Sequence, residues 1–239
     1  KFLEIKLPKS KDEVEVFTCG DLSFLERLKE DEAFTAREKK NIQHQIELSE
    51  SYYIPRRQWV YLANVSLNHA AEEASHFIRH LVAGEEFPRL PEDAFYAQVL
   101  HEAVGFFGSK IINPKRKCTR TADFKGFIEY FKEMSVPRDR GIELEVAHAV
   151  VEIKKHEKNG KPVANAGILV RRQELFFGVT RALGYMLGET FYHGMLQGKL
   201  PKPEIKALYK NSFSKTGEPF RIYRKLLRKL RQVSLPQRI

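Results

Sequence analysis

Apolar residues recur at intervals of three and four along most of this chain, and this spacing places them on one face of an α-helix. The clearest segment begins with the acidic turn Pro91-Glu92-Asp93. Its apolar face consists of Phe95, Tyr96, Val99, Leu100, Ala103, Val104 and Phe107. The same spacing predicts helices over residues 21–53, 57–83 and 171–196, and a shorter helix around 127–134. The sequence therefore predicts a mainly α-helical bundle.

The first residues follow a different pattern, because apolar and polar residues alternate there. The alternation covers Phe2, Leu3, Ile5 and Leu7, and then Val14, Val16 and Phe17. A polar turn joins the two runs, so we expect a small N-terminal β-hairpin. The 239 residues, of which 42% are hydrophobic, can bury one sizeable core. We expect a β-like element at 1–20, the helical bundle domain at 21–200, and a linker with a basic amphipathic tail at 201–239.

Several classes of protein are excluded by what the sequence lacks. It has no run of 18 or more uncharged apolar residues, so we expect no membrane span. Its two cysteines are too few for a disulfide scaffold and lack metal-site spacing, which favours a cytoplasmic protein. It also has no glycine-rich phosphate loop and no Gly-x-Ser-x-Gly motif, so neither nucleotide hydrolysis nor serine hydrolysis is indicated.

Two stripes of histidine and glutamate carry the most specific chemical signal. The first stripe consists of His69, Glu73, His76 and His80. The second consists of Glu145, His148, Glu152 and His156. Each contains Glu-x-x-His, and on a helix two side chains three residues apart point the same way and can bind one metal site. The segment from Gly141 to His156 also alternates like a strand, and a strand would place Glu145 and His148 on opposite faces. The first stripe is also compatible with an ordinary solvated helix surface.

The order of these motifs resembles that of the ferritin-like superfamily of di-iron and di-manganese proteins, over roughly residues 34–157. The resemblance implies a metal-ligand set of Glu47, Glu73, His76, Glu102, Glu145 and His148. It implies two iron or manganese ions and an oxidoreductase or oxygenase with an unknown substrate. Glu50 is an alternative to Glu47, and Glu129 is an alternative to Glu102. Further candidate ligands are His69, His80, Glu152, Glu189 and His193.

The segment 171–196 contains two glycines and one histidine–glutamate pair whose spacing fits a role in helix packing or an internal contact. Gly184 and Gly188 are four residues apart, which fits close packing between two helices. Glu189 and His193 are also four apart, so they fit either a pair of metal ligands or an internal contact along the helix.

The C-terminal segment predicts a basic amphipathic helix over residues 219–233. Its apolar residues are Ile222, Tyr223, Leu226, Leu227, Leu230 and Val233. Its basic residues are Arg221, Arg224, Lys225, Arg228, Lys229 and Arg231. The apolar stripe either docks on the core of the protein or joins the cations in binding a partner. The alternative function is therefore a non-enzymatic helical binding protein that uses this tail to engage nucleic acid, an anionic membrane or an acidic protein. A homodimer is a further expected assembly.

Overall fold

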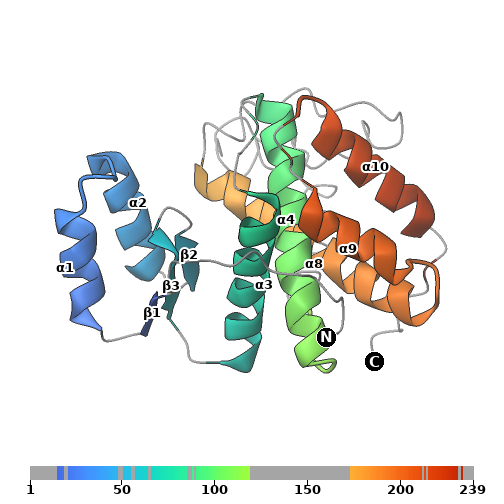
Figure 1. Ribbon diagram of the computed structural model, residues 1–239, viewed down its shortest axis with the longest axis horizontal. Helices are drawn as coiled ribbons and strands as arrows, with labels where there is room; N and C mark the ends of the chain where they lie inside the picture. The colour runs from blue at the N-terminus through green and yellow to red at the C-terminus, as the bar shows by residue number, and fades with distance from the viewer. Residues whose placement is uncertain are drawn as a thin grey trace, which may run out of the picture.

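The structure is a computed structural model, and it describes residues 15–18, 21–47, 51–54, 57–63, 66–84, 88, 90–118, 173–211, 213, 215–230 and 233. In these residues the chain forms seven helices and one small sheet, so the prediction of a mainly α protein is confirmed (Figure 1). Of the helices described, none is both long enough and apolar enough to cross a membrane.

In the described part of the chain, the strands and the two helices between them precede the three longest helices. The elements are β1 (Glu15–Thr18), α1 (Leu22–Glu30), α2 (Ala36–Glu47), β2 (Tyr52–Ile54), β3 (Trp59–Leu62), α3 (Leu67–Ala83), α4 (Pro91–Ile112), α8 (Gln173–Leu196), α9 (Lys202–Lys210) and α10 (Glu218–Leu230). The helices predicted from Pro91 and over 171–196 correspond to α4 and α8. The segments predicted around 127–134 and 141–156 lie outside the described residues.

The sheet has the strand order β1-β3-β2, and it differs from the predicted hairpin. β1 pairs in parallel with β3, with Val16 opposite Val60, while β2 pairs antiparallel with β3. The first arm of the predicted hairpin, residues 2–7, lies outside the described residues. The described partner of β1 therefore comes from far along the chain, a pairing that alternation within one segment cannot reveal.

The helix predicted over residues 57–83 is wrong in its first part, because residues 59–62 form β3. Aromatic and β-branched residues such as Trp59, Val60 and Tyr61 favour strands, and here they pair with strands on both sides. The helix begins only at Leu67, where the Ser66 side chain accepts a hydrogen bond from the His69 amide at 3.3 Å. Likewise, the helical periodicity over 21–53 divides into α1 and α2, and its end is β2.

The two faces of the sheet contact different helices, as expected for strands whose side chains alternate. Trp59 and Tyr61 pack with Phe24 of α1 and Ile42 of α2. On the other face, Tyr53, Val60 and Leu62 pack with Ala70 and Phe77 of α3. The sheet therefore separates α1 and α2 from α3, and Figure 1 shows α1 and α2 on the far side of the strands.

The main core surrounds α4, which packs against α3, α8 and α10. Its largest fully buried side chains include Tyr96, Phe95, Phe107 and Phe191. Gly184 and Gly188 of α8 lie directly on α4: a Cβ at Gly188 would be 2.5 Å from the Ala103 carbonyl oxygen. The predicted role of these two glycines in close helix packing is confirmed. Because α4 is enclosed on several sides, its polar residues are forced into the protein interior.

Candidate metal centre

A group of three buried side chains from α3 and α4 could hold a metal ion. Glu72, His76 and Glu102 each offer one ligand atom, and these atoms all lie within 4.8 Å of one another. All three residues are less than a tenth exposed. Two carboxylate oxygens and one imidazole nitrogen suit divalent first-row metals such as iron, manganese and zinc.

The backbone of α3 and a glycine of α4 place these ligands together. Glu72 and His76 are four residues apart on α3, so they lie on the same face about one turn apart. Gly105 of α4 lies opposite them: a Cβ there would be 3.2 Å from Cγ of Glu72 and closer still to the His76 imidazole. The absence of a side chain at Gly105 therefore makes the room that His76 occupies.

Each ligand carboxylate also has a guanidinium partner. Nη2 of Arg116 donates to Oε2 of Glu72 at 2.7 Å. Nε of Arg181 lies 3.7 Å from Oε2 of Glu102, and Gln98 donates to the other oxygen of Glu102 at 2.8 Å. The buried charges are therefore paired, as buried carboxylates require.

Tyr185 of α8 adds a hydroxyl group to this cluster. Its hydroxyl donates a hydrogen bond to Glu72, and its ring lies 4.7 Å from that of Phe106. Burial, together with the negative charges of Glu72 and Glu102, raises the pKa of Tyr185 well above its usual value. The phenol therefore stays protonated next to the carboxylates.

Glu73 is also buried, but it is not one of the three grouped ligands. Burial is the main cause that raises the pKa of its carboxyl well above the usual value, and the charges of Glu72 and Glu102 add to this effect. The raised pKa therefore favours the protonated form of the Glu73 carboxyl.

The His76 ring stacks on the ring of His101 from α4, with centroids 4.0 Å apart. Burial lowers the pKa of His76 to about 4, so its imidazole is neutral at neutral pH. Burial and the neighbouring His76 and Arg79 also lower the pKa of His101 well below its usual value. Within the described residues, the buried Nδ1 atom of His76 has no hydrogen-bond partner. A neutral imidazole with an unpartnered nitrogen is the form that binds a metal.

A second polar cluster lies between α4 and α8. Glu189 is 3.4 Å from Nζ of Lys110 and 3.8 Å from Nε2 of His193. Lys110 also donates to the carbonyl oxygen of Arg116 at 2.5 Å. This lysine links the second cluster to the loop that presents Arg116 to Glu72.

The structure brings some of the sequence candidates together and separates others. His76 and Glu102 belong to the buried group, Glu73 lies beside it, and Glu189 and His193 form the second cluster. Glu47 is 61% exposed on α2, where its carboxylate lies 3.8 Å from His44. His69 and His80 are half-buried elsewhere on α3. The candidates Glu50, Glu129, Glu145, His148 and Glu152 lie outside the described residues.

Sequence reasoning missed one candidate ligand, Glu72, and the charged partners of the group. The Glu-x-x-His motif points to Glu73, whereas the grouped glutamate is Glu72, four residues before His76. That spacing is an equally good helical signal and could have been considered. Arg116 and Arg181 carry no local signal, because only the fold brings them to the carboxylates.

No protein-family model matches this sequence, and neither the curated proteins nor the solved structures include a match to it. The case for a function therefore depends on the site.

Proposed function

We propose that this protein is a metal-dependent oxidoreductase whose iron or manganese ion is held by Glu72, His76 and Glu102. The observation that carries the proposal is the approach of these three buried ligand atoms to within 4.8 Å of one another. Ligand atoms lie about 2 Å from a bound ion, so each of the three would have to move by up to about 1 Å to reach it.

The donor set supports a catalytic ion more than a structural one. Structural sites are closed by four protein ligands, whereas three protein ligands leave positions open. An iron or manganese ion with open positions supplies one-electron and oxygen chemistry. Around it, Arg116 and Arg181 orient the two carboxylates, and Tyr185 holds a proton next to Glu72.

The ferritin-like form of the proposal adds a second ion. It rests on the order of the sequence motifs, in which Glu145 and His148 form the second Glu-x-x-His pair. Buried Glu73 would be available to such an ion from the first pair. The number of bound ions therefore separates the di-metal form from a mononuclear one.

The competing interpretation is a structural network of ion pairs with no metal. Arg116 and Arg181 already satisfy much of the charge of Glu72 and Glu102. Such a network does not explain His76, which is neutral, buried and without a partner for Nδ1 among the described residues. A buried polar atom of this kind usually has a ligand, a water or a protein partner.

Metal analysis tests the proposal directly. Protein stripped with a chelator is reloaded anaerobically with Fe(II) or Mn(II), and the bound metal is counted by mass spectrometry. We expect at least one ion per chain, and its loss in His76→Gln and Glu102→Gln. Iron-loaded protein should also consume oxygen faster than the variants do.

The matched control is the double variant His44→Gln, Glu47→Gln, which removes an exposed histidine–glutamate pair on α2. It should keep the full metal content. Circular dichroism confirms that each variant is folded. A folded wild-type protein that takes up no iron, manganese or zinc would contradict the proposal, and zinc alone would contradict its redox chemistry.

A further inference from the structure

α10 presents two faces that differ in chemistry, and the described part of the chain packs on only one of them. Pro219, Tyr223, Leu226 and Leu230 are buried, and the last three belong to the main core around α4. The apolar stripe of the predicted basic helix therefore docks on the protein's own core. What remains available to a partner is the cationic face.

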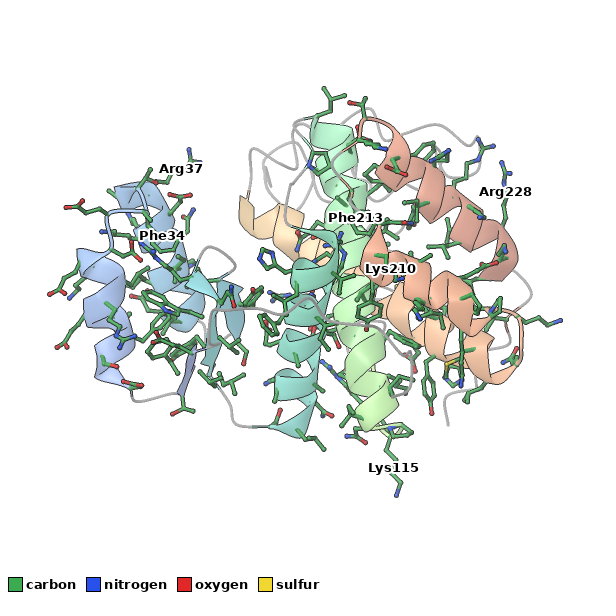
Figure 2. The ribbon with its side chains drawn as sticks, in the orientation of Figure 1. Phe34, Arg37, Lys115, Lys210, Phe213 and Arg228 are labelled. Atoms are coloured by element: carbon green, nitrogen blue, oxygen red, sulfur yellow. The ribbon has the colours of Figure 1, made fainter. Side chains whose placement is uncertain are left out.

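The cationic face contains three basic side chains without a counter-ion in the described part of the chain. Arg221 pairs with Glu218 at 3.3 Å, and Lys229 pairs with Glu204 of α9. Arg224, Lys225 and Arg228 are exposed, and no described residue forms an ion pair with them. Figure 2 shows Arg228 pointing away from the ribbon of α10. Arg231 lies outside the described residues.

This surface lies in the most strongly basic part of the sequence. After Pro219 the chain has seven lysines and arginines and no acidic residue, within a formal net charge of +10 for the whole chain. Such a concentration of positive charge attracts a polyanion, over a distance that salt screening limits.

We propose that Arg224, Lys225 and Arg228 bind the phosphate backbone of duplex DNA without sequence preference. Arg224 and Arg228 are four residues apart, so the three free cations extend about 6 Å along the helix axis. Double-stranded DNA carries about one phosphate charge per 1.7 Å of its axis when both strands are counted, so about three phosphates lie within that length. The three free cations therefore match the charge that a duplex presents over the same length.

The packing of α10 disfavours the other partners. Insertion into a membrane needs an exposed apolar face, and none of the exposed large hydrophobic residues in the described part of the chain lies on α10. Single strands bind by stacking on aromatic rings, but Phe220 and Tyr223 pack on Tyr96 at 4.9 and 5.0 Å. An acidic protein partner usually needs an apolar anchor, which this face lacks.

The test uses the full chain and a fluorescent random-sequence DNA duplex, with binding followed by anisotropy. Between about 50 and about 200 mM salt, three phosphate contacts predict a slope of about −2.7 for log K against log salt concentration. The triple variant Arg224→Gln, Lys225→Gln, Arg228→Gln should lose roughly 100-fold or more in affinity near 0.1 M salt and most of the slope.

The matched control is the triple variant Lys29→Gln, Arg37→Gln, Lys40→Gln, which removes three exposed cations from α1 and α2. Its net charge is the same as that of the α10 triple variant. Figure 2 shows Arg37 on the opposite side of the molecule from Arg228. The control should bind DNA almost as the wild type does. Because all six side chains are exposed, both variants should remain folded by circular dichroism.

Other probes decide between partners. Duplex RNA should bind with a similar slope, because it presents the same phosphates. No binding of duplex DNA near 50 mM salt would overturn the proposal. The proposal would also be overturned if the two triple variants lost equal affinity for DNA. Tighter binding to single strands, or sedimentation with anionic vesicles in place of DNA binding, would overturn it as well. The result is independent of the metal content of the protein.

Discussion

Replacing Gly184 with alanine tests whether the close contact between α4 and α8 positions the candidate ligand Glu102. A Cβ at position 184 would lie 2.8 Å from the carbonyl oxygen of Val99, 3.0 Å from the amide nitrogen of Ala103, and closer still to Cβ of Glu102. Non-bonded atoms normally pack about 3.5–4.0 Å from a carbon, and backbone atoms cannot rotate out of the way. The two helices must therefore separate locally.

The size of the effect follows from two opposing contributions. Overpacking a core costs about 1–3 kcal/mol, and a clash with the α4 backbone belongs at the upper end of that range. Alanine in place of glycine stabilises a helix interior by about 1 kcal/mol. We therefore expect Gly184→Ala to lower the free energy of unfolding by about 2 kcal/mol. With a urea dependence of about 3 kcal/mol per molar, the unfolding midpoint falls by about 0.7 M.

Gly194→Ala on the same helix is the matched control. A Cβ at Gly194 would lie 2.9 Å from Cδ2 of Leu230 and 3.3 Å from Cγ2 of Val233, and both are the ends of side chains that can move. We expect its stability to be unchanged or to rise by up to about 1 kcal/mol. Urea unfolding followed by circular dichroism measures the stability of both variants. Metal titration measures their affinity for metal, which should fall if Glu102 is displaced. If Gly184→Ala is as stable as the wild type and binds metal equally well, the reasoning is refuted.

Two further predictions concern buried carboxyl groups. In metal-free protein, Glu73→Gln should gain stability relative to the wild type as the pH rises, which urea titrations over a range of pH would measure. Burial raises the pKa of Glu73 in the folded protein. The wild type therefore loses stability as the pH rises from the unfolded pKa of about 4.3 to the folded pKa. If the free energies of unfolding of the two proteins change in parallel with pH, this prediction is wrong. Asp93→Ala should lower the free energy of unfolding by about 1–3 kcal/mol, because both oxygens of the buried Asp93 carboxylate accept from the Gly217 amide at 3.0 and 2.8 Å. The same assay measures it, and an unchanged midpoint would contradict it.

The sequence predicted the long helices correctly because their signals are local. α4 has an acidic first turn and a continuous apolar face, and α8 has two glycines at the spacing of a close crossing. The sheet was missed because its strands are short and because β1 pairs with β3 across more than forty residues, as Val16 and Val60 show. The periodicity of one segment contains no information about a partner so far along the chain.

The missed sheet also separates Glu47 from the buried group. The motif order of the ferritin-like superfamily implies Glu47 as a ligand, but the sheet lies between α2 and α3 and this carboxylate is exposed. The choice of Glu73 over Glu72 is a different matter. Adjacent residues point about 100° apart on a helix, and both of these are buried. Only the position of α4 shows which carboxylate faces Glu102.

The charges around the site set a requirement for any ion that binds there. Glu72 and Glu102 already face Arg116 and Arg181, so a divalent ion would add two positive charges to a balanced buried cluster. Glu73 can restore part of the balance, because its raised pKa keeps a proton that the charge of the ion would release. Glutamine at this position cannot ionise. Glu73→Gln should therefore weaken metal binding while it stabilises the metal-free protein, and a variant that simply folds poorly cannot produce these opposite effects.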